Sequence, residues 1–330
     1  MVQVDVNEIL ASLDSGLKRK LFVGDQIPEY EYIPTPSATL NRALGGGIIQ
    51  GRQTLIFGSK SSGKSTLCLG MAANAQRMGK TVAWVDAESS YDPKWAERLG
   101  VDNTNIIVSK AQTVNDMVDV VTQLMRAGID LVIVDSISSL LPAIYFDKSD
   151  NLKQLEDTKQ IGAEARDMAN AVKMMNYANN NTALVLISQV RTGIHATYTE
   201  MIPTGGQATL FYSSTIVKLN SPKSQAIKGK VKVGDKLIEK IVGRNVDWLI
   251  TYNKTAEAFT AGSYPLIFVG DNVGVDNITE VVDMAIESGA VEKRGAWLYY
   301  GEDQWNGRDK LAEHLRNDPE LLKKLESSSV

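Results

Sequence analysis

Eight consecutive residues in the first quarter of the chain have the types and the spacing that bind phosphate groups. They are Gly58, Ser59, Lys60, Ser61, Ser62, Gly63, Lys64 and Ser65, followed by Thr66, and they stand between the apolar segment 54–57 and a helical pattern. The glycines let the backbone aim its N–H groups at phosphate oxygens, Lys64 reaches the β- and γ-phosphates, and Ser65 ligates Mg²⁺. This strand–loop–helix context predicts a nucleotide site that includes Mg²⁺.

Three further polar side chains come shortly after apolar segments that are typical of buried parallel strands. Asp135 follows segment 131–134, Glu88 follows 82–85, and Gln189 follows 184–187. Because the carboxyl ends of parallel strands meet at one edge of a sheet, we expect all three side chains beside the phosphate loop.

Each of these residues suits a chemical role at such a site and also has a plainer alternative. Asp135 suits the Mg²⁺ side, through a water molecule, unless it only caps the next segment. Glu88 suits a base that polarises the attacking water, and otherwise forms a surface salt bridge. The neutral amide of Gln189 cannot act as a base, but it can hydrogen-bond a γ-phosphate and move when that phosphate leaves.

The elements that must position these residues alternate between strands and helices. Apolar runs at 54–57, 82–85, 106–108, 131–134 and 184–187 are separated by helical patterns that include 65–78, 113–127 and 163–178. This alternation predicts an α/β fold with a parallel sheet covered by helices. β-rich segments at 214–219, 247–252 and 266–269 are expected to extend the sheet, and a small helical unit begins near residue 274.

The first 22 residues have one apolar face at helical spacing, and a proline-containing stretch at 23–36 follows them. This pattern predicts a helical arm held off the main body, which docks either on its own domain or on a neighbouring subunit. We assign residues 1–32 to this arm and its linker, 33–265 to the core, and 266–330 to a small C-terminal α+β domain.

The composition is that of an ordinary soluble globular protein, with 43% apolar and 22% charged residues. No apolar run approaches the roughly 20 residues of a membrane helix, and the start lacks the features of a signal peptide, so we expect a cytoplasmic protein with no membrane partner. The lone Cys68 is expected in the core. The net charge of −4 argues against coating nucleic acid through global charge, whereas the basic stretch 218–244 is either a local polyanion surface or a solvated hairpin.

The chain resembles the RecA family of recombinases over nearly its whole length. The matching motifs are 58–65; Val85-Asp86-Ala87-Glu88 with Tyr91-Asp92-Pro93; 132–136; Gly162-Ala163-Glu164-Ala165-Arg166; Ser188-Gln189-Val190-Arg191; Thr204-Gly205-Gly206-Gln207-Ala208 with Phe211-Tyr212; and, near the C-terminus, 289–293 with Gly295-Ala296-Trp297. The resemblance implies a RecA-type P-loop ATPase core with a central, mostly parallel sheet. It also implies a DNA-dependent ATPase that forms a helical filament on single-stranded DNA and promotes homologous pairing and strand exchange with duplex DNA.

The resemblance also implies roles for individual residues around the nucleotide. ATP would be the nucleotide, Glu88 the catalytic base, and Gln189 the switch between the ATP and DNA sites. Trp95 would stack on adenine, unless it is a core residue, and Asp92 would bond the adenine amino group. The two DNA loops would be 142–162 and 191–206.

For DNA, the resemblance implies neutralisation of the sugar–phosphate backbone without reading of bases. Basic side chains and glycine N–H groups would contact phosphates, and aliphatic side chains would wedge between triplets of stretched bases. The expected contacts are Arg166, Lys173 and Arg191 for phosphates, Gly205, Gly206 and Gln207 in the second loop, and Ile161 and Ile194 as wedges, although either isoleucine is alternatively a buried residue.

A head-to-tail filament would place ATP between subunits, with the N-terminal arm packed on the neighbour and Phe211 carrying the ATP signal across the interface. Lys254 matches one of two lysines that reach the neighbour's γ-phosphate. The position of the other lysine holds Tyr252, which supplies no positive charge, so inter-subunit activation is weaker or Lys240 or Arg244 substitutes.

Other departures from the family pattern lie in the small domain. Glu287 and Gln304 occupy positions where the family captures duplex DNA with lysines, which leaves Lys293, Arg294 or Arg308 for that task. Such departures indicate a specialised member, for example one encoded by a phage. Two alternative functions are a nucleotide-switched scaffold that assembles without exchanging strands, and a ring-forming helicase motor.

Overall fold

The computed structural model describes residues 5–14, 16, 21, 23–27, 29–146, 153, 163–192, 201–234 and 236–328. It divides into two units, residues 1–31 and residues 32–330. In the first unit, helix α1 (Val6–Ser12) and a 3₁₀ turn, η1 (Gly24–Gln26), are described. Val6 and Ile9 are about half exposed, so the apolar face predicted for this segment is not covered within its own unit.

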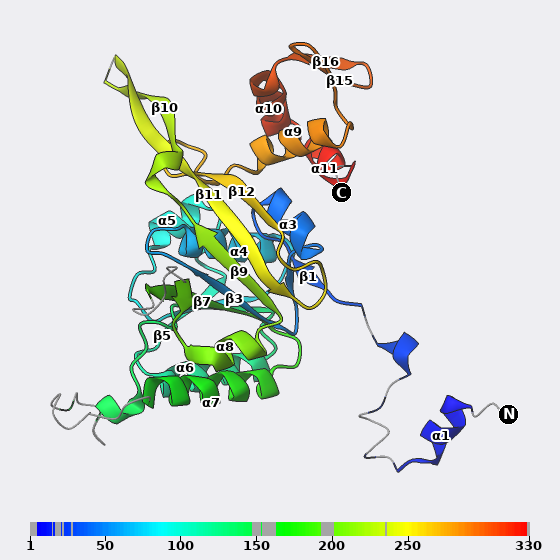
Figure 1. The fold of residues 1–330 in the computed structure, drawn as a ribbon, viewed down its shortest axis with the longest axis vertical. Helices are drawn as coiled ribbons and strands as arrows, with labels where there is room; N and C mark the ends of the chain where they lie inside the picture. The colour runs from blue at the N-terminus through cyan, green and yellow to red at the C-terminus, as the bar shows by residue number, and fades with distance from the viewer. Residues whose placement is uncertain are drawn as a thin grey trace. The chain divides into compact units, whose positions relative to one another are not determined.

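A large sheet forms the centre of the second unit (Figure 1). Its strands lie in the order β13-β12-β11-β9-β3-β7-β6-β4-β5, and neighbours from β9 to β5 are parallel. The parallel strands are β3 (Gln53–Gly58), β4 (Val82–Asp86), β5 (Ile106–Lys110), β6 (Leu131–Asp135), β7 (Ala183–Thr192) and β9 (Thr215–Asn220). The antiparallel part consists of β11 (Lys236–Asn253), β12 (Ala261–Ile267) and β13 (Gly274–Val275), with β10 (Ala226–Val233) paired to β11 and β8 (Met201–Pro203) paired to β7.

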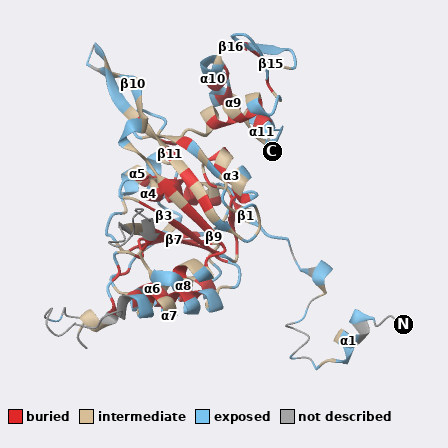
Figure 2. Cartoon of the chain, viewed as in Figure 1, coloured by how far each residue is buried: buried red, intermediate tan, exposed pale blue. Residues whose placement is uncertain are grey.

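Helices cover both faces of this sheet because its central strands are apolar on both faces. One buried cluster joins Ile56, Ile133 and Val185 to helix α4 (Lys64–Arg77), and Cys68 lies in it, as predicted. The other joins Leu55, Val132 and Leu184 to helices α6 (Val114–Arg126) and α7 (Ala163–Ala178). Figure 2 shows the buried residues concentrated between these layers. The remaining helices of the core are α3 (Ala38–Leu44), α5 (Pro93–Arg98) and α8 (Gly206–Tyr212), with 3₁₀ turns η2 (Ala143–Tyr145) and η4 (Lys223–Gln225).

The α/β prediction is therefore confirmed, but three predicted strands are wrong in extent. Segment 184–187 is only the first part of the ten-residue strand β7, so Gln189 lies within the strand and not after it. Segment 247–252 is the second half of an 18-residue strand, β11, whose first half forms a hairpin with β10. The first half of β11 was not predicted as a strand, because its lysines alternate with other residues in an exposed ribbon and leave no continuous apolar face that a sequence pattern would indicate. Segment 266–269 is also shifted, since β12 ends at Ile267.

A third buried cluster forms the small C-terminal domain. It packs three helices, α9 (Asn277–Glu287), α10 (Arg308–Asn317) and α11 (Pro319–Ser328), on a three-stranded antiparallel sheet of β14 (Glu292–Arg294), β15 (Trp297–Tyr300) and β16 (Asp303–Asn306). The predicted α+β character of this domain is confirmed. None of the helices among the described residues combines the length and the apolar character needed to cross a lipid bilayer.

Helices α3 and α9 join the C-terminal domain to the core through one buried carboxylate. Glu280 Oε1 accepts hydrogen bonds from Ser37 Oγ at 2.7 Å, from the Thr39 hydroxyl at 2.5 Å and from Thr39 N at 3.3 Å, while Asn277 Oδ1 accepts from Ala38 N at 3.0 Å. Burial raises the pKa of Glu280 to about 7, although the hydrogen bonds from Thr39 and Ser37 oppose this.

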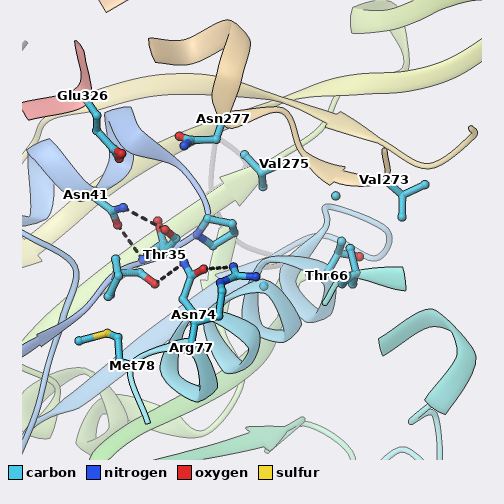
Figure 3. A pocket seen from close by; sticks show the side chains of 15 residues that line it. Thr35, Asn41, Thr66, Asn74, Arg77, Met78, Val273, Val275, Asn277 and Glu326 are labelled. Carbon is cyan, nitrogen blue, oxygen red and sulfur yellow. Dashed lines mark hydrogen bonds between the residues drawn. The ribbon is translucent and has the colours of Figure 1, made fainter. Parts of the chain in front are cut away.

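A cleft of about 450 Å³ lies beside this joint. Figure 3 shows Asn41 and Arg77 of core helices together with Asn277 and Glu326 of C-terminal helices around it. Burial raises the pKa of Glu326, which faces the cleft from α11.

Candidate nucleotide and DNA site

The phosphate loop lies between the carboxyl end of β3 and the first turn of α4. Gly58 has no room for a side chain, because a Cβ there would lie 2.2 Å from the carbonyl oxygen of Leu219. Gly63 has φ +87°, a conformation that favours glycine, and its Cβ would lie 2.7 Å from Leu266 Cδ2. The two glycines therefore let the loop pack closely against β9 and β12.

Lys64 and Ser62 supply the polar side chains inside this loop. Lys64 Nζ donates to the carbonyl oxygens of Gly58 at 3.1 Å and Ser59 at 2.9 Å, and burial lowers the pKa of Lys64 although Asp135 and Glu88 oppose this. Ser62 Oγ is buried and has no hydrogen-bond partner among the described residues. A buried ammonium group and an unpartnered hydroxyl fit a phosphate, whose oxygens accept hydrogen bonds from both.

Asp135 ends β6 beside the first turn of α4, as its predicted role requires. The Ser65 hydroxyl hydrogen-bonds to it. Burial, with a further contribution from the charge of Glu88, raises the pKa of Asp135 to about 6, while Ser65 and Lys64 oppose the rise. A hydroxyl and a carboxylate next to phosphate oxygens are the hard oxygen donors that Mg²⁺ prefers, so these residues fit the predicted ion.

Glu88 is held by three donors at the same sheet edge. Its Oε1 accepts from Ser136 Oγ at 2.6 Å, from Gln189 Nε2 at 2.8 Å and from Ser139 Oγ at 3.1 Å. Burial alone would raise the pKa of Glu88, but these three hydrogen bonds and the charge of Lys64 together lower it. Glu88 is thus kept ionised, with its carboxylate fixed in one orientation.

The loop that carries Glu88 is anchored by Asp86, a residue for which no role was predicted. Asp86 ends β4 and is buried, and its two carboxylate oxygens accept from Ser90 N and Tyr91 N, both at 3.0 Å. Ser136 and Ser139 were also missed as positioning residues. The signal for all three was their place at the end of a strand or within four residues after it, where small polar side chains hydrogen-bond to neighbouring loops.

Gln189 connects Glu88 to the far end of the second predicted DNA loop. Its side chain donates to Glu88, its N–H donates to Ser138 Oγ at 2.8 Å, and its carbonyl accepts from Thr204 N at 3.0 Å. Thr204 also hydrogen-bonds to Ser138 and to Ser188. Gln189, which lies within β7 beside Gly58, therefore links the phosphate edge to the residue that precedes Gly205.

In the region expected to hold adenine, Trp95 lies next to Arg98, a residue that was not predicted. Trp95 is half-buried and packs against the core, so both of its predicted roles are compatible with its position. The Arg98 guanidinium lies 5.2 Å from the centre of the Trp95 ring, and Arg98 Nη2 donates to the carbonyl oxygen of Gly270 at 2.7 Å. Asp92 is the N-cap of α5 and accepts from Lys94 N at 2.9 Å.

The predicted DNA contacts are brought together only in part. Gly205 and Gly206 have φ of +109° and +77° at the start of α8, and a Cβ on Gly206 would lie 3.7 Å from Ala165 Cβ, next to the exposed Arg166. Lys173 is exposed on the same helix, but seven residues further along, about 10 Å from Arg166 along the helix axis. Gln207 is exposed in the first turn of α8, the backbone of Arg191 pairs with Ile202, and Ile161 and Ile194 lie outside the described residues.

Lys254 lies at the amino ends of the parallel strands, whereas the phosphate loop of its own chain lies at their carboxyl ends. Its N–H donates to Ser214 O at 2.9 Å, at the amino end of β9, whereas Gly58 pairs with Leu219 near the carboxyl end. The intervening length of β9 is about 13 Å. Tyr252 is 41% exposed at the same edge, whereas Lys240 and Arg244 lie in the other half of β11. Phe211, on α8, is 76% exposed.

The fold and this site together define a P-loop ATPase built on a mostly parallel sheet, with a glutamate in the loop after β4 and a glutamine on β7 at the phosphate edge. Two family models match the chain, one described as the RecA N-terminal domain over residues 9–272 and the other as the RecA C-terminal domain over residues 279–328. The chain belongs to the RecA family.

Curated relatives agree with this assignment. The chain is 37% identical over 304 residues to Protein RecA of Thermus aquaticus, which covers 90% of this chain and 84% of the relative. It is 33% identical to Protein RecA of Caulobacter vibrioides over 91% of this chain and 81% of the relative, and 31% identical to that of Brucella canis over 98% and 86%. The protein is accordingly an ATP-dependent recombinase with DNA-dependent ATPase activity, and filament formation and strand exchange are the known activity of this family.

Proposed function

We propose that Glu88 is the catalytic base of ATP hydrolysis and that Gln189 couples hydrolysis to DNA binding. Glu88 is ionised and held by three donors, so it can accept a proton from a water molecule beside the γ-phosphate. Lys64 and the backbone of residues 58–65 orient the phosphates, with Thr66 following in the first turn of α4. When bound, Mg²⁺, held by Ser65 and by Asp135 through water, offsets phosphate charge.

The observation that supports the coupling is the hydrogen bond between Gln189 and Glu88, 2.8 Å long. A γ-phosphate beside Glu88 would compete for the same amide, and a shift of Gln189 would move its carbonyl, which accepts from Thr204. Gly205 and Gly206 come directly after Thr204, so a change at the phosphate edge reaches the N–H groups proposed to bind DNA phosphates. Single-stranded DNA would lie along Gly205, Gly206, Gln207 and Arg166, and along Arg191, Lys173, Ile161 and Ile194 in the extended contact.

We assign the segments of the chain to separate tasks on the same basis. Residues 1–32 would form an arm that packs on a neighbouring copy, 33–265 the ATPase core, and 266–330 a small domain near duplex DNA. Because Lys254 lies at the edge opposite its own phosphate loop, it would act on the nucleotide of a neighbour in the filament, while the exposed Phe211 would contact that neighbour. Trp95 and Asp92 would contact the adenine, with Arg98 behind the Trp95 ring.

The test is ATP turnover with and without long single-stranded DNA, comparing the native chain, Glu88→Gln and the control Glu97→Gln, whose side chain is exposed on α5. We expect strong stimulation by DNA, loss of about 10²- to 10⁴-fold in Glu88→Gln, and no loss in the control. Nucleotide should still tighten DNA binding in Glu88→Gln.

Three results would contradict the proposal. Turnover retained in Glu88→Gln would remove it as the base. Turnover of the native chain that ignores DNA, together with filaments that form no joint molecules, would favour the scaffold alternative. Closed hexamers that unwind duplex DNA directionally would favour the helicase alternative.

A further inference from the structure

The hairpin formed by β10 and the first half of β11 extends from the sheet as a two-stranded ribbon (Figure 1). Among the described strands, β10 pairs only with β11, and most of the ribbon is exposed (Figure 2). Lys240 and Arg244 belong to it and were considered above as substitutes for Tyr252, but they lie in the first half of β11, whereas Tyr252 lies near its other end. No other residue assigned to ATP or to single-stranded DNA above belongs to it. The proposed function therefore assigns no role to this hairpin.

The register of the hairpin separates its side chains into two different faces. Residues directly opposite each other in an antiparallel pair lie on the same face, and the pairs alternate between faces. We call the face that carries Lys228, Lys230, Lys232, Leu237, Glu239 and Ile241 the lysine face, because the observed pairs are Lys228 with Ile241, Lys230 with Glu239, and Lys232 with Leu237. All six of these residues are exposed. The opposite face contains the half-buried Val231 and Ile238, with Lys236 and Lys240 beside them.

The hairpin is strongly basic within an acidic chain. Residues 226–244 contain six basic and two acidic residues, a net charge of +4, whereas the whole chain has a net charge of −4. Glu239 lies 3.8 Å from Lys228, and within the described part of the chain no carboxylate forms an ion pair with Lys230 or Lys232. The positive charge of the lysine face is therefore mostly uncompensated.

The geometry of the lysine face suits a polynucleotide backbone. Alternate residues of a strand are about 6.7 Å apart, so three lysines form a row whose spacing is close to that of successive phosphates. A two-stranded ribbon is also narrow enough to lie in the major groove of duplex DNA. The exposed Leu237 and Ile241 on the same face can contact sugars, which carry no charge.

Two of the three other basic residues considered for duplex DNA, Arg294 and Arg308, are less available. Arg294 donates to Glu292 through two nitrogens, at 2.8 and 2.7 Å, and Arg308 Nη1 lies 3.0 Å from Asp283 Oδ1. Both arginines would have to break an ion pair to bind a phosphate, whereas Lys230 and Lys232 would not.

We propose that the lysine face of the β10–β11 hairpin binds the sugar–phosphate backbone of duplex DNA. This inference rests on the proposed recombinase function, in which single-stranded DNA is bound elsewhere. The competing explanation is that the lysines only keep β10, an edge strand, from pairing with other chains.

The test compares two double variants that remove the same charge from opposite faces. Lys230→Ala with Lys232→Ala removes two lysines from the lysine face, and Lys236→Ala with Lys240→Ala removes two from the other face of the same hairpin. Protein is first assembled with ATP on unlabelled single-stranded DNA, and binding of a short fluorescent duplex is then followed by anisotropy at several salt concentrations. Thermal unfolding of each variant checks that it folds.

We expect the lysine-face variant to lose about tenfold in duplex affinity and to reduce the slope of log K against log salt by about 2, since each phosphate contact contributes roughly 0.9. The control variant should stay within about twofold of the native protein. Glu239→Gln should tighten duplex binding, a gain that damage to the fold does not produce.

Equal losses in both double variants, or no loss in either, would overturn the inference. So would a lysine-face variant that aggregates but binds duplex normally, which is the result expected for edge protection. Failure of the native protein to bind single-stranded DNA with ATP would instead overturn the proposed function.

Discussion

Replacing Glu280 by glutamine should remove a specific pH dependence from the stability of the protein. Glu280 is 4% exposed, and its Oε2 has no hydrogen-bond partner among the described residues. Glutamine keeps the acceptor oxygen for Ser37 and Thr39 and has nearly the shape of the protonated acid. The substitution therefore changes the charge of the joint between α3 and α9 more than its packing.

The direction and the size of this pH dependence follow from the raised pKa of Glu280. The folded protein holds the proton of Glu280 up to about pH 7, whereas the ordinary pKa is 4.5. The stability from this group is therefore complete below about pH 4.5. It falls as the pH rises from there, because the unfolded chain ionises Glu280 while the folded state keeps the proton, and it is fully lost once the pH has risen through about 7. Each pKa unit corresponds to about 1.4 kcal/mol, which makes the total loss on the order of 3 kcal/mol.

The assay is urea denaturation of the native chain, Glu280→Gln and the control Glu287→Gln between about pH 5 and 8. Glu287 lies on the same helix, and its side chain is exposed. We expect the unfolding free energy of the native chain to fall by about 2–3 kcal/mol relative to that of Glu280→Gln as the pH rises across this range. The unfolding free energy of Glu287→Gln should change with pH as that of the native chain does. A difference between the native chain and Glu280→Gln that does not change with pH would refute the reasoning.

Three further predictions concern the nucleotide site. Affinity for the Mg²⁺ nucleotide should fall as the pH drops below about 6, where Asp135 takes up a proton, and Asp135→Asn should bind more weakly with a flat pH profile, as measured by titration with a fluorescent nucleotide. Lys254→Ala and Glu88→Gln should each lose DNA-stimulated turnover. A mixture of the two variants should recover part of it, because an intact Lys254 of one subunit can act on the nucleotide beside an intact Glu88 of its neighbour. A mixture with no turnover would contradict action between subunits. Asp86→Asn should lower kcat several-fold more than it changes KM, because the loop carrying Glu88 loses two charge-assisted hydrogen bonds, and an unchanged kcat would show that the loop needs no anchor.

The hairpin shows that the frequency of lysines in a sequence does not tell on which face of the structure each lysine lies. The basic stretch 218–244 was visible as a count of lysines, with a polyanion surface and a solvated hairpin as equal alternatives. The structure confirms the hairpin. It also places Lys228, Lys230 and Lys232 on one face and Lys236 and Lys240 on the other, a separation that depends on the register and on the irregularity between Ile227 and Lys228.

The residues predicted for the nucleotide site could be placed together from the sequence because each lies at or shortly after an apolar run. A parallel strand buried on both faces leaves a continuous apolar run, and the residue after that run must lie at the carboxyl edge. Glu88, Asp135 and Gln189 were therefore placed at one edge before their contacts were known. The hydroxyls of Ser136 and Ser139 were missed because serines are common in loops and their hydrogen bonds depend on which strands are neighbours.

By itself, the sequence determined the phosphate loop, the alternation of strands and helices, and the strand-end residues, because these depend on neighbouring residues and on local periodicity. The order of the strands was decided only by the tertiary structure, since crossover connections place β3 between β7 and β9. That order puts Lys254 at the edge opposite its own phosphate loop. Long-range packing likewise brings Glu280 to Ser37, 243 residues earlier in the chain, because burying a carboxylate requires donors that no local pattern specifies.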